Sequence, residues 1–224
     1  MIELKNVSKT YDNLQVLKNF NIKFEDNMIT CLFGPSGVGK TTIANIVAKL
    51  IAVESGSVIS LENAVFSYVF QEPRLLEWYC VYDNIDFVLK DVYAPEKRKI
   101  IINNYIDMVE LTDYKDYKPR ALSGGMAQRV SLARAFAYPS NVLIMDEPFK
   151  GLDMKLKQEM ILSFKKLFNE SKRTVLFITH DIDEAILLSD TIYIIKDRPA
   201  EVVKTINKNS YAQIDEIKKE LLTF

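Results

Sequence analysis

A glycine-rich segment that ends in a lysine and two threonines is the part of this sequence best suited to hold a phosphate group. It fits the pattern GxxxxGK[ST], and it follows an apolar strand and precedes a helical segment, as phosphate loops do. Glycines leave backbone N–H groups bare, so that these groups and the helix N-terminus can surround a β-phosphate. We expect Lys40 to reach the β- and γ-phosphates of a nucleotide and the Thr41 hydroxyl to hold Mg²⁺. The segment comprises Gly34, Pro35, Ser36, Gly37, Val38, Gly39, Lys40, Thr41 and Thr42.

Two carboxylates follow the apolar run Val142–Met145. The carboxyl ends of strands are where open α/β sheets bind their ligands. We expect Asp146 to order the Mg²⁺ shell and Glu147 to polarise an attacking water. An acidic pair at a strand end is also common in simple turns. The phosphate loop elsewhere in the chain favours the functional interpretation.

A second candidate anion site begins at Ser123, 83 residues after Lys40. A serine N-cap followed by Gly124 and Gly125 exposes bare N–H groups at the start of a helix. The alternative is an ordinary capped helix whose glycines lower its helix propensity without any gain.

Composition excludes several classes of protein. The 224 residues include 29 basic and 30 acidic side chains, so no general attraction to nucleic acid or anionic lipid is expected. Two cysteines and one histidine are too few for a structural zinc site or a disulfide framework. No run of 18 apolar residues occurs, and the first nine residues lack the core of a signal peptide. We therefore expect a cytosolic protein that does not cross the membrane.

The elements that must position these residues can be read from the hydrophobic pattern. Residues 2–33 alternate apolar and polar side chains in short pieces and predict a small, partly antiparallel N-terminal sheet. A helix is predicted over 41–51 and a buried strand over 65–70, with Gly56 in a turn. Residues 73–122 are helix-prone and predict an inserted helical subdomain.

The second half of the chain alternates strands with helices. Apolar strands are predicted over 142–145, 175–179 and 192–195. Continuous apolar strands separated by helices indicate a mainly parallel sheet covered on both faces, which is an α/β fold. We expect one domain over 1–224, with a core of 1–72 and 123–224 around the helical subdomain 73–122. Helices are predicted over 124–138, near 154–169 and 182–189, and in an amphipathic tail with Ile214, Ile217 and Leu221 on one face.

In combination, these motifs resemble the ATP-binding subunit of ABC transporters, and the resemblance runs from about Ile2 to Thr205. The segment Leu122–Gln128 reads LSGGMAQ, and Gly151-Leu152-Asp153 and Thr179-His180-Asp181 match further family motifs. The resemblance implies a P-loop NTPase (RecA-like) core that uses ATP and Mg²⁺. It also implies a composite site, in which ATP on one subunit's phosphate loop is capped by Ser123, Gly124 and Gly125 of the other.

Four further residues take roles from the resemblance. Tyr11 is similar to the aromatic residue that stacks on adenine, although it could be an ordinary edge-strand tyrosine. Gln71 is similar to the glutamine that senses Mg²⁺ and the water, with a solvated loop residue as the alternative. Asp153 is similar to an aspartate that communicates across the dimer, or it is a helix N-cap. His180 is similar to the histidine that contacts the γ-phosphate.

Within the family, residues 71–78 and 179–185 are most similar to the nitrate, sulfonate and taurine importer branch. Three positions depart from that branch: Glu77, Ala127 and Lys150, the last of which precedes Gly151. These departures put the substrate class in doubt but not the ATPase activity. Lys150 could alter communication across the dimer, or it could be a solvated loop lysine.

The expected partners follow from the same resemblance. They are a second copy of the chain, integral-membrane permease subunits and, indirectly, a solute-binding protein, with no nucleic acid. The chain would then lie peripherally on the inner face of the cell membrane. Alternatives are the ATPase of an exporter or of a regulatory or DNA-repair system. The DNA-repair class has long coiled-coil inserts or basic surfaces, which the spacing and the net charge of −1 disfavour.

Overall fold

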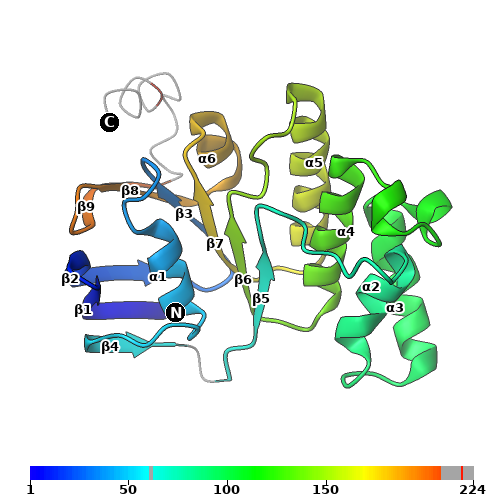
Figure 1. Ribbon diagram of the computed structural model, residues 1–224, viewed down its shortest axis with the longest axis horizontal. Coiled ribbons are helices and arrows are strands. Elements are labelled where there is room, and N and C mark those ends of the chain that lie inside the picture. The colour runs from blue at the N-terminus through cyan, green and yellow to red at the C-terminus, as the bar shows by residue number, and fades with distance from the viewer. Residues whose placement is uncertain (61–62, 208–217, 219–224) are drawn as a thin grey trace.

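A six-stranded sheet forms the centre of the computed structural model, which describes residues 1–60, 63–207 and 218 (Figure 1). The first five strands in sheet order run parallel, and only the last pairs antiparallel with its neighbour. The predicted mainly parallel sheet is therefore confirmed. In sheet order the strands are β5 (Phe66–Val69), β6 (Val142–Asp146), β7 (Thr174–Thr179), β3 (Ile29–Phe33), β8 (Thr191–Lys196) and β9 (Glu201–Asn207).

The sequence pattern placed β3 in the N-terminal sheet, and this prediction was wrong. All five residues of β3 are buried, and it pairs in parallel with β7 on one side and β8 on the other. The apparent alternation arose from Thr30, a polar residue that is only 2% exposed. As a central parallel strand, β3 delivers the phosphate loop to the edge where β6 and β7 also end.

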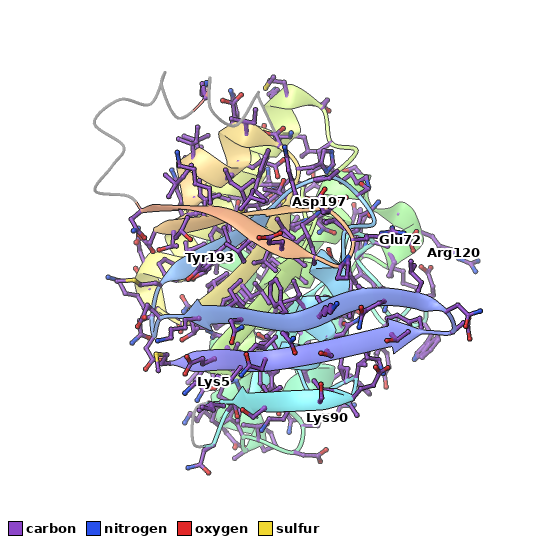
Figure 2. The ribbon with its side chains drawn as sticks, turned by 90° about the vertical axis from the view of Figure 1, so that its left-hand side faces the viewer. Lys5, Glu72, Lys90, Arg120, Tyr193 and Asp197 are labelled. Carbon is purple, nitrogen blue, oxygen red and sulfur yellow. The ribbon has the colours of Figure 1, made fainter. Side chains whose placement is uncertain are left out.

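A three-stranded antiparallel sheet in the order β2–β1–β4 covers one side of the molecule, and Figure 2 faces this sheet. Its strands are β1 (Ile2–Tyr11), β2 (Leu14–Phe24) and β4 (Ser55–Ile59). Gly56 lies inside β4 and not in a turn. Its φ is +87°, and a Cβ there would come within 2.3 Å of the Asn6 carbonyl oxygen, so only glycine fits this irregular pairing.

Helices lie on both faces of the central sheet. The helix α1 (Lys40–Val47) packs with the antiparallel sheet on one face, and the other long helices pack on the opposite face. Helix α1 ends four residues before the predicted position, because Lys49 adopts a left-handed conformation with φ of +60°. The opposite face carries α4 (Gly124–Ala137), α5 (Met154–Glu170) and α6 (Ile182–Leu188).

Residues 73–122 contain two α-helices, α2 (Val81–Asp86) and α3 (Pro95–Met108), and short 3₁₀ turns. They pack against α4, as Figure 1 shows at the end of the molecule far from the antiparallel sheet. Whether this segment is a separate subdomain stays a proposal.

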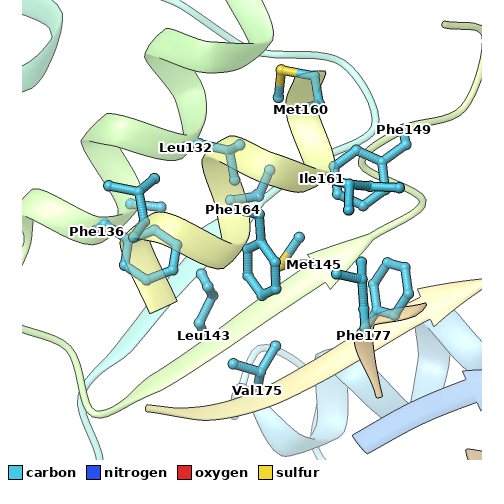
Figure 3. Close-up of a cluster of buried hydrophobic side chains, with 14 of the residues drawn as sticks. Leu132, Phe136, Leu143, Met145, Phe149, Met160, Ile161, Phe164, Val175 and Phe177 are labelled. Carbon is cyan, nitrogen blue, oxygen red and sulfur yellow. The ribbon is translucent and has the colours of Figure 1, made fainter. Parts of the chain in front are cut away.

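The core between the sheet and α4 and α5 is rich in aromatic side chains (Figure 3). Phe136 and Phe164 meet with ring centroids 6.0 Å apart, and Phe149 and Phe177 meet at the same separation. Phe149 is fully buried and comes two residues after Glu147. It therefore anchors the loop that follows the candidate general base.

Two further expectations from the sequence concern the C-terminal tail and membrane-spanning helices. The predicted amphipathic tail lies outside the described residues apart from 218. Within the described ranges, no helix combines the length and the apolar character that a membrane span requires.

Candidate nucleotide site

The phosphate loop joins β3 to α1. Gly39 is the N-cap of α1 and has φ of +113°, a conformation that side chains disfavour, so the chain enters the helix through glycine. Val38 has its side chain buried in the core, which leaves only its backbone N–H for a phosphate.

Lys40 is held inside this loop. Its Nζ donates hydrogen bonds to the carbonyl oxygens of Gly34 and Pro35, each 2.7 Å long, and the residue is buried. Burial lowers the pKa of Lys40, and the nearby carboxylates of Glu147 and Asp146 oppose that shift. An ammonium already confined here meets a phosphate without losing further side-chain freedom.

Thr41 and Asp146 meet at the floor of the site. The Thr41 hydroxyl donates to Oδ2 of Asp146 at 3.0 Å. Burial raises the pKa of Asp146, although the bond from Thr41 acts in the opposite direction. A hydroxyl beside a carboxylate gives the oxygen ligands that Mg²⁺ prefers when phosphates and waters complete its shell. The residues therefore fit the ion, even though the described parts of the chain hold no cluster of three or more ligating side chains.

Glu147 lies directly after β6 with a left-handed backbone, φ +46°, and its N–H donates to the Ile178 carbonyl oxygen at 3.0 Å. Its Oε1 lies 3.2 Å from Nδ1 of His180 and its Oε2 lies 2.5 Å from Nζ of Lys150. Burial raises the pKa of Glu147, but Lys150 and His180 outweigh it, so the pKa lies below its usual value. Glu147 is thus a buried carboxylate held between two basic groups.

A pocket of about 610 Å³ contains most of the predicted site residues. Tyr11 is the last residue of β1, is 41% exposed and contributes to the lining, as an adenine-stacking residue would. Gln71 lines the same pocket from the segment after β5. The other predicted residues in the lining are Ser36, Gly37, Gly39, Lys40, Thr41, Thr42, Asp146 and Glu147.

His180 does not line this pocket. It lines two smaller cavities, one of about 160 Å³ with Gly34 and Pro35, and one of about 90 Å³ beside Glu147. The histidine therefore meets the site through the carboxylate of Glu147. Its contact with a γ-phosphate stays a prediction.

The signature residues also lie outside the pocket. Ser123 is the N-cap of α4, and its Oγ accepts a hydrogen bond from the Met126 N–H at 3.3 Å. A Cβ on Gly125 would lie 2.3 Å from Cδ1 of Leu156 in α5, whereas Gly124 has no heavy atom within 4 Å of that position. Gly125 is therefore explained by helix packing, and Gly124 is the open position.

Asp153 caps α5. Its Oδ1 accepts from the Leu156 N–H at 3.0 Å, which matches the N-cap alternative. The structure describes one chain, so communication by Asp153 across a dimer stays a prediction.

One residue of the pocket lining was not predicted from the sequence, and one signature residue has a structural role that was not predicted. Arg198, in the connection between β8 and β9, lines the pocket and donates from Nε to the Gly37 carbonyl oxygen at 2.6 Å. Gln128 is buried and bridges the carbonyl oxygens of Phe70 and Pro148 at 3.1 and 2.9 Å. No local pattern marks Arg198, whereas Gln128 stands in the signature segment Leu122–Gln128.

Comparison with known proteins decides the family. Residues 17–150 match the family described as ABC transporter. The chain belongs to the ABC transporter family. This ABC ATPase is 37% identical to the aliphatic sulfonates import ATP-binding protein SsuB of Bacillus thuringiensis subsp. konkukian, over 92% of this chain and 83% of that protein.

A second relative has a different named solute. The spermidine/putrescine import ATP-binding protein PotA of Clostridium acetobutylicum is 36% identical, over 92% of this chain and 61% of that protein. Among solved structures, the ATP-binding cassette MJ0796, dimeric in a post-hydrolysis state with ADP and Pi, superposes with a TM-score of 0.80. It is 31% identical, and the match covers 93% of this chain and 99% of that one. The P-loop NTPase fold and the ATPase activity expected from the motifs are confirmed.

The arrangement explains how this ABC ATPase can act on ATP. The phosphate loop would provide backbone N–H groups and the Lys40 ammonium for the negative charge of the phosphates. Thr41 and Asp146 are the residues that would hold Mg²⁺, which neutralises charge on the β- and γ-phosphates when bound. Glu147 is the carboxylate in the pocket whose surroundings keep it ionised, as a base that accepts a proton from water must be.

Proposed function

We propose that this ABC ATPase powers the import of a small solute through separate membrane permease subunits. Two relatives support this proposal, since both are named as import ATP-binding proteins. The sulfonate relative and the similarity of residues 71–78 and 179–185 to the nitrate, sulfonate and taurine branch favour a small organic anion. A polyamine is the competing solute class, given the second relative.

The observation that carries the mechanism is the position of the signature. Ser123, Gly124 and Gly125 lie outside the pocket that holds the phosphate loop of their own chain. A second copy related by two-fold symmetry could place its signature over that pocket, which would give two sites per dimer. Bare N–H groups at the start of α4 would then face the γ-phosphate and stabilise its negative charge.

In the proposed reaction a water attacks the γ-phosphate in line with the leaving oxygen. Glu147 orients the water and accepts its proton, and Lys40 stabilises the charge that spreads over the phosphoryl oxygens. Gln71 would sense whether nucleotide is present, because it lines the pocket and begins the segment that leads into the helices of 73–122. Closure of the dimer is the movement that would be passed to the permease.

The permease would dock beside Gln71 on the exposed aromatic residues of the helical segment. Trp78 is 67% and Phe87 is 50% exposed, and Tyr79 lies between them with ring centroids 6.1 and 6.0 Å away. Exposed aromatic clusters of this kind are typical of protein interfaces. Such docking would hold the chain at the inner face of the membrane, with a solute-binding protein reached only through the permease.

Glu147→Gln tests the composite site. The amide keeps the shape of the side chain but accepts no proton, so we expect ATP to remain bound and the protein to run as a dimer in gel filtration with ATP and Mg²⁺. The wild-type protein should return to monomer as it hydrolyses ATP. A Glu147→Gln variant that stays monomeric with saturating ATP contradicts the two-subunit site.

The solute is identified by a separate experiment. The ATPase is purified with its co-purifying membrane subunits in lipid vesicles, and stimulation of ATP hydrolysis is measured with alkanesulfonates and with polyamines in the presence of the cognate binding protein. Stimulation by sulfonates alone supports the proposed class. Failure to recover any membrane subunit contradicts the transporter function and leaves a regulatory ATPase.

A further inference from the structure

Lys150 is one of the residues that differ from the importer branch, and the mechanism above gives it no role. Its side chain does not lie free in solvent. Its Nζ is 2.5 Å from Oε2 of Glu147, although its side chain is 41% exposed. It also lines the nucleotide pocket. The lysine is therefore an ion-pair partner of the candidate general base.

The ion pair leaves Glu147 with both carboxylate oxygens engaged. His180 is at Oε1 and Lys150 is at Oε2, and Glu147 itself is only 9% exposed. The contact with Lys150 is ionic and lacks the geometry of a directed hydrogen bond, so Oε2 has no such bond of its own. A general base must lie within hydrogen-bond reach of the water that it deprotonates. A carboxylate oxygen can accept more than one hydrogen bond, but the Lys150 ammonium 2.5 Å from Oε2 competes with the water for that oxygen.

The side chain of Lys150 indicates that it is the partner that moves, because a flexible four-carbon stem joins its ammonium to the backbone. Gly151 follows it with φ of +78°, and no heavy atom lies within 4 Å of the place where a Cβ would be. His180, by contrast, lies between the last residue of β7 and Asp181, the N-cap of α6. Glu147 is fixed by its own bond to Ile178 and by the buried Phe149. The backbone N–H of Lys150 donates to the Glu147 carbonyl oxygen at 3.2 Å, so the movement required is that of the lysine side chain.

We propose that Lys150 is a positioning residue for the general base: it holds Oε2 of Glu147 in the separate subunit and releases that oxygen when two subunits close around ATP. The inference rests on the proposed function, in which the closed dimer is the hydrolysing state. Breaking two such ion pairs opposes closure, so the pair delays hydrolysis until assembly is complete. A serine or glycine at this position would exert no such restraint.

A double-mutant cycle on dimer formation tests the coupling without any turnover. Wild type, Lys150→Ala, Glu147→Gln and the double variant are titrated by analytical ultracentrifugation with Mg²⁺ and a non-hydrolysable ATP analogue. A partly exposed ion pair corresponds to about a threefold effect, so two pairs give about a tenfold lower dimer dissociation constant for Lys150→Ala. In the Glu147→Gln background the same change should have less than about a twofold effect, because no ion pair remains to be broken.

Matched controls keep the test specific. Lys165→Ala removes an exposed lysine from α5 and should leave the dimer constant at the wild-type value. Lys150→Arg keeps a cation beside Glu147 and should restore the wild-type dimer constant. Basal ATP turnover, measured as kcat at saturating ATP, should rise about threefold in Lys150→Ala.

Two results would overturn the inference. A fall in turnover in Lys150→Ala would mean that the lysine assists hydrolysis. An equal shift of the dimer constant in the wild-type and Glu147→Gln backgrounds would mean that Lys150 acts without the carboxylate. If no variant dimerises with the analogue, the composite site itself is wrong, and the inference falls with it.

Discussion

Asp146 shows at the scale of one residue how a nucleotide site opposes the stability of its own fold. Burial raises the pKa of this carboxyl, so the folded protein binds a proton more tightly than the unfolded chain does. Stability therefore falls as the pH rises from the ordinary value of 3.8 through the raised pKa. At neutral pH and without a bound cation, the folded protein carries a negative charge on Asp146 that the buried surroundings of this carboxylate disfavour.

Asp146→Asn should consequently stabilise the nucleotide-free protein while it abolishes Mg²⁺-dependent hydrolysis. We expect a gain of about 1 kcal/mol at pH 7, or about 2–4 °C in Tm. The gain should shrink toward pH 4, where the aspartate becomes protonated. Differential scanning calorimetry without nucleotide or Mg²⁺, across this pH range, measures the difference. A lower Tm for Asp146→Asn at pH 7 would show that the charge is stabilising.

At the scale of the element, the sequence predicted the strands and helices well where a pattern is local. Strands β6 and β7 and helices α4 and α5 begin or end within one or two residues of their predicted bounds. The prediction failed for β3, because Thr30 is buried although the alternating pattern of the sequence makes it look like a residue that faces solvent. It also missed Arg198, which reaches Gly37 across 161 residues of sequence, a contact that only the folded sheet creates.

The connection between β8 and β9 therefore acts as a support for the phosphate loop. Arg198→Ala removes the hydrogen bond to Gly37 and a cation from the pocket, so we expect ATP to bind about three- to tenfold more weakly. Glu201→Ala, at the exposed start of β9, is the control and should bind as the wild type does. Isothermal titration calorimetry gives both constants. Unchanged affinity in Arg198→Ala would limit its role to the hairpin itself.

At the scale of the whole molecule, the nucleotide pocket and the exposed aromatic residues belong to different parts of the chain. Gln71 lines the pocket, and Trp78 lies seven residues later on the helical side. The buried Gln128 ties helix α4 to the segments that follow β5 and β6, because it donates to their carbonyl oxygens. The sequence alone indicated both parts through their motifs but not this bridge, which depends on how α4 packs.

Trp78→Ala should separate permease binding from nucleotide binding. An exposed side chain contributes little to the fold, so stability and ATP affinity should stay within about 0.5 kcal/mol of wild type. Recovery of the membrane subunits in a pull-down should fall at least about tenfold, as for an interface hot spot. Leu162→Ala, with a side chain of equal exposure at 66% on α5, is the matched control. Equal losses for both variants would place the permease elsewhere.

The position of Leu156 would allow the two nucleotide sites of a dimer to influence each other. Its N–H is capped by Asp153, in the loop that starts at Glu147, while its side chain fills the space that Gly125 leaves beside α4. A shift of that loop therefore displaces the start of the signature helix as well. In a dimer the signature would contact the ATP bound by the opposite subunit. A movement of the loop that starts at Glu147 in one subunit would therefore reach the ATP of the other subunit through the Leu156 side chain.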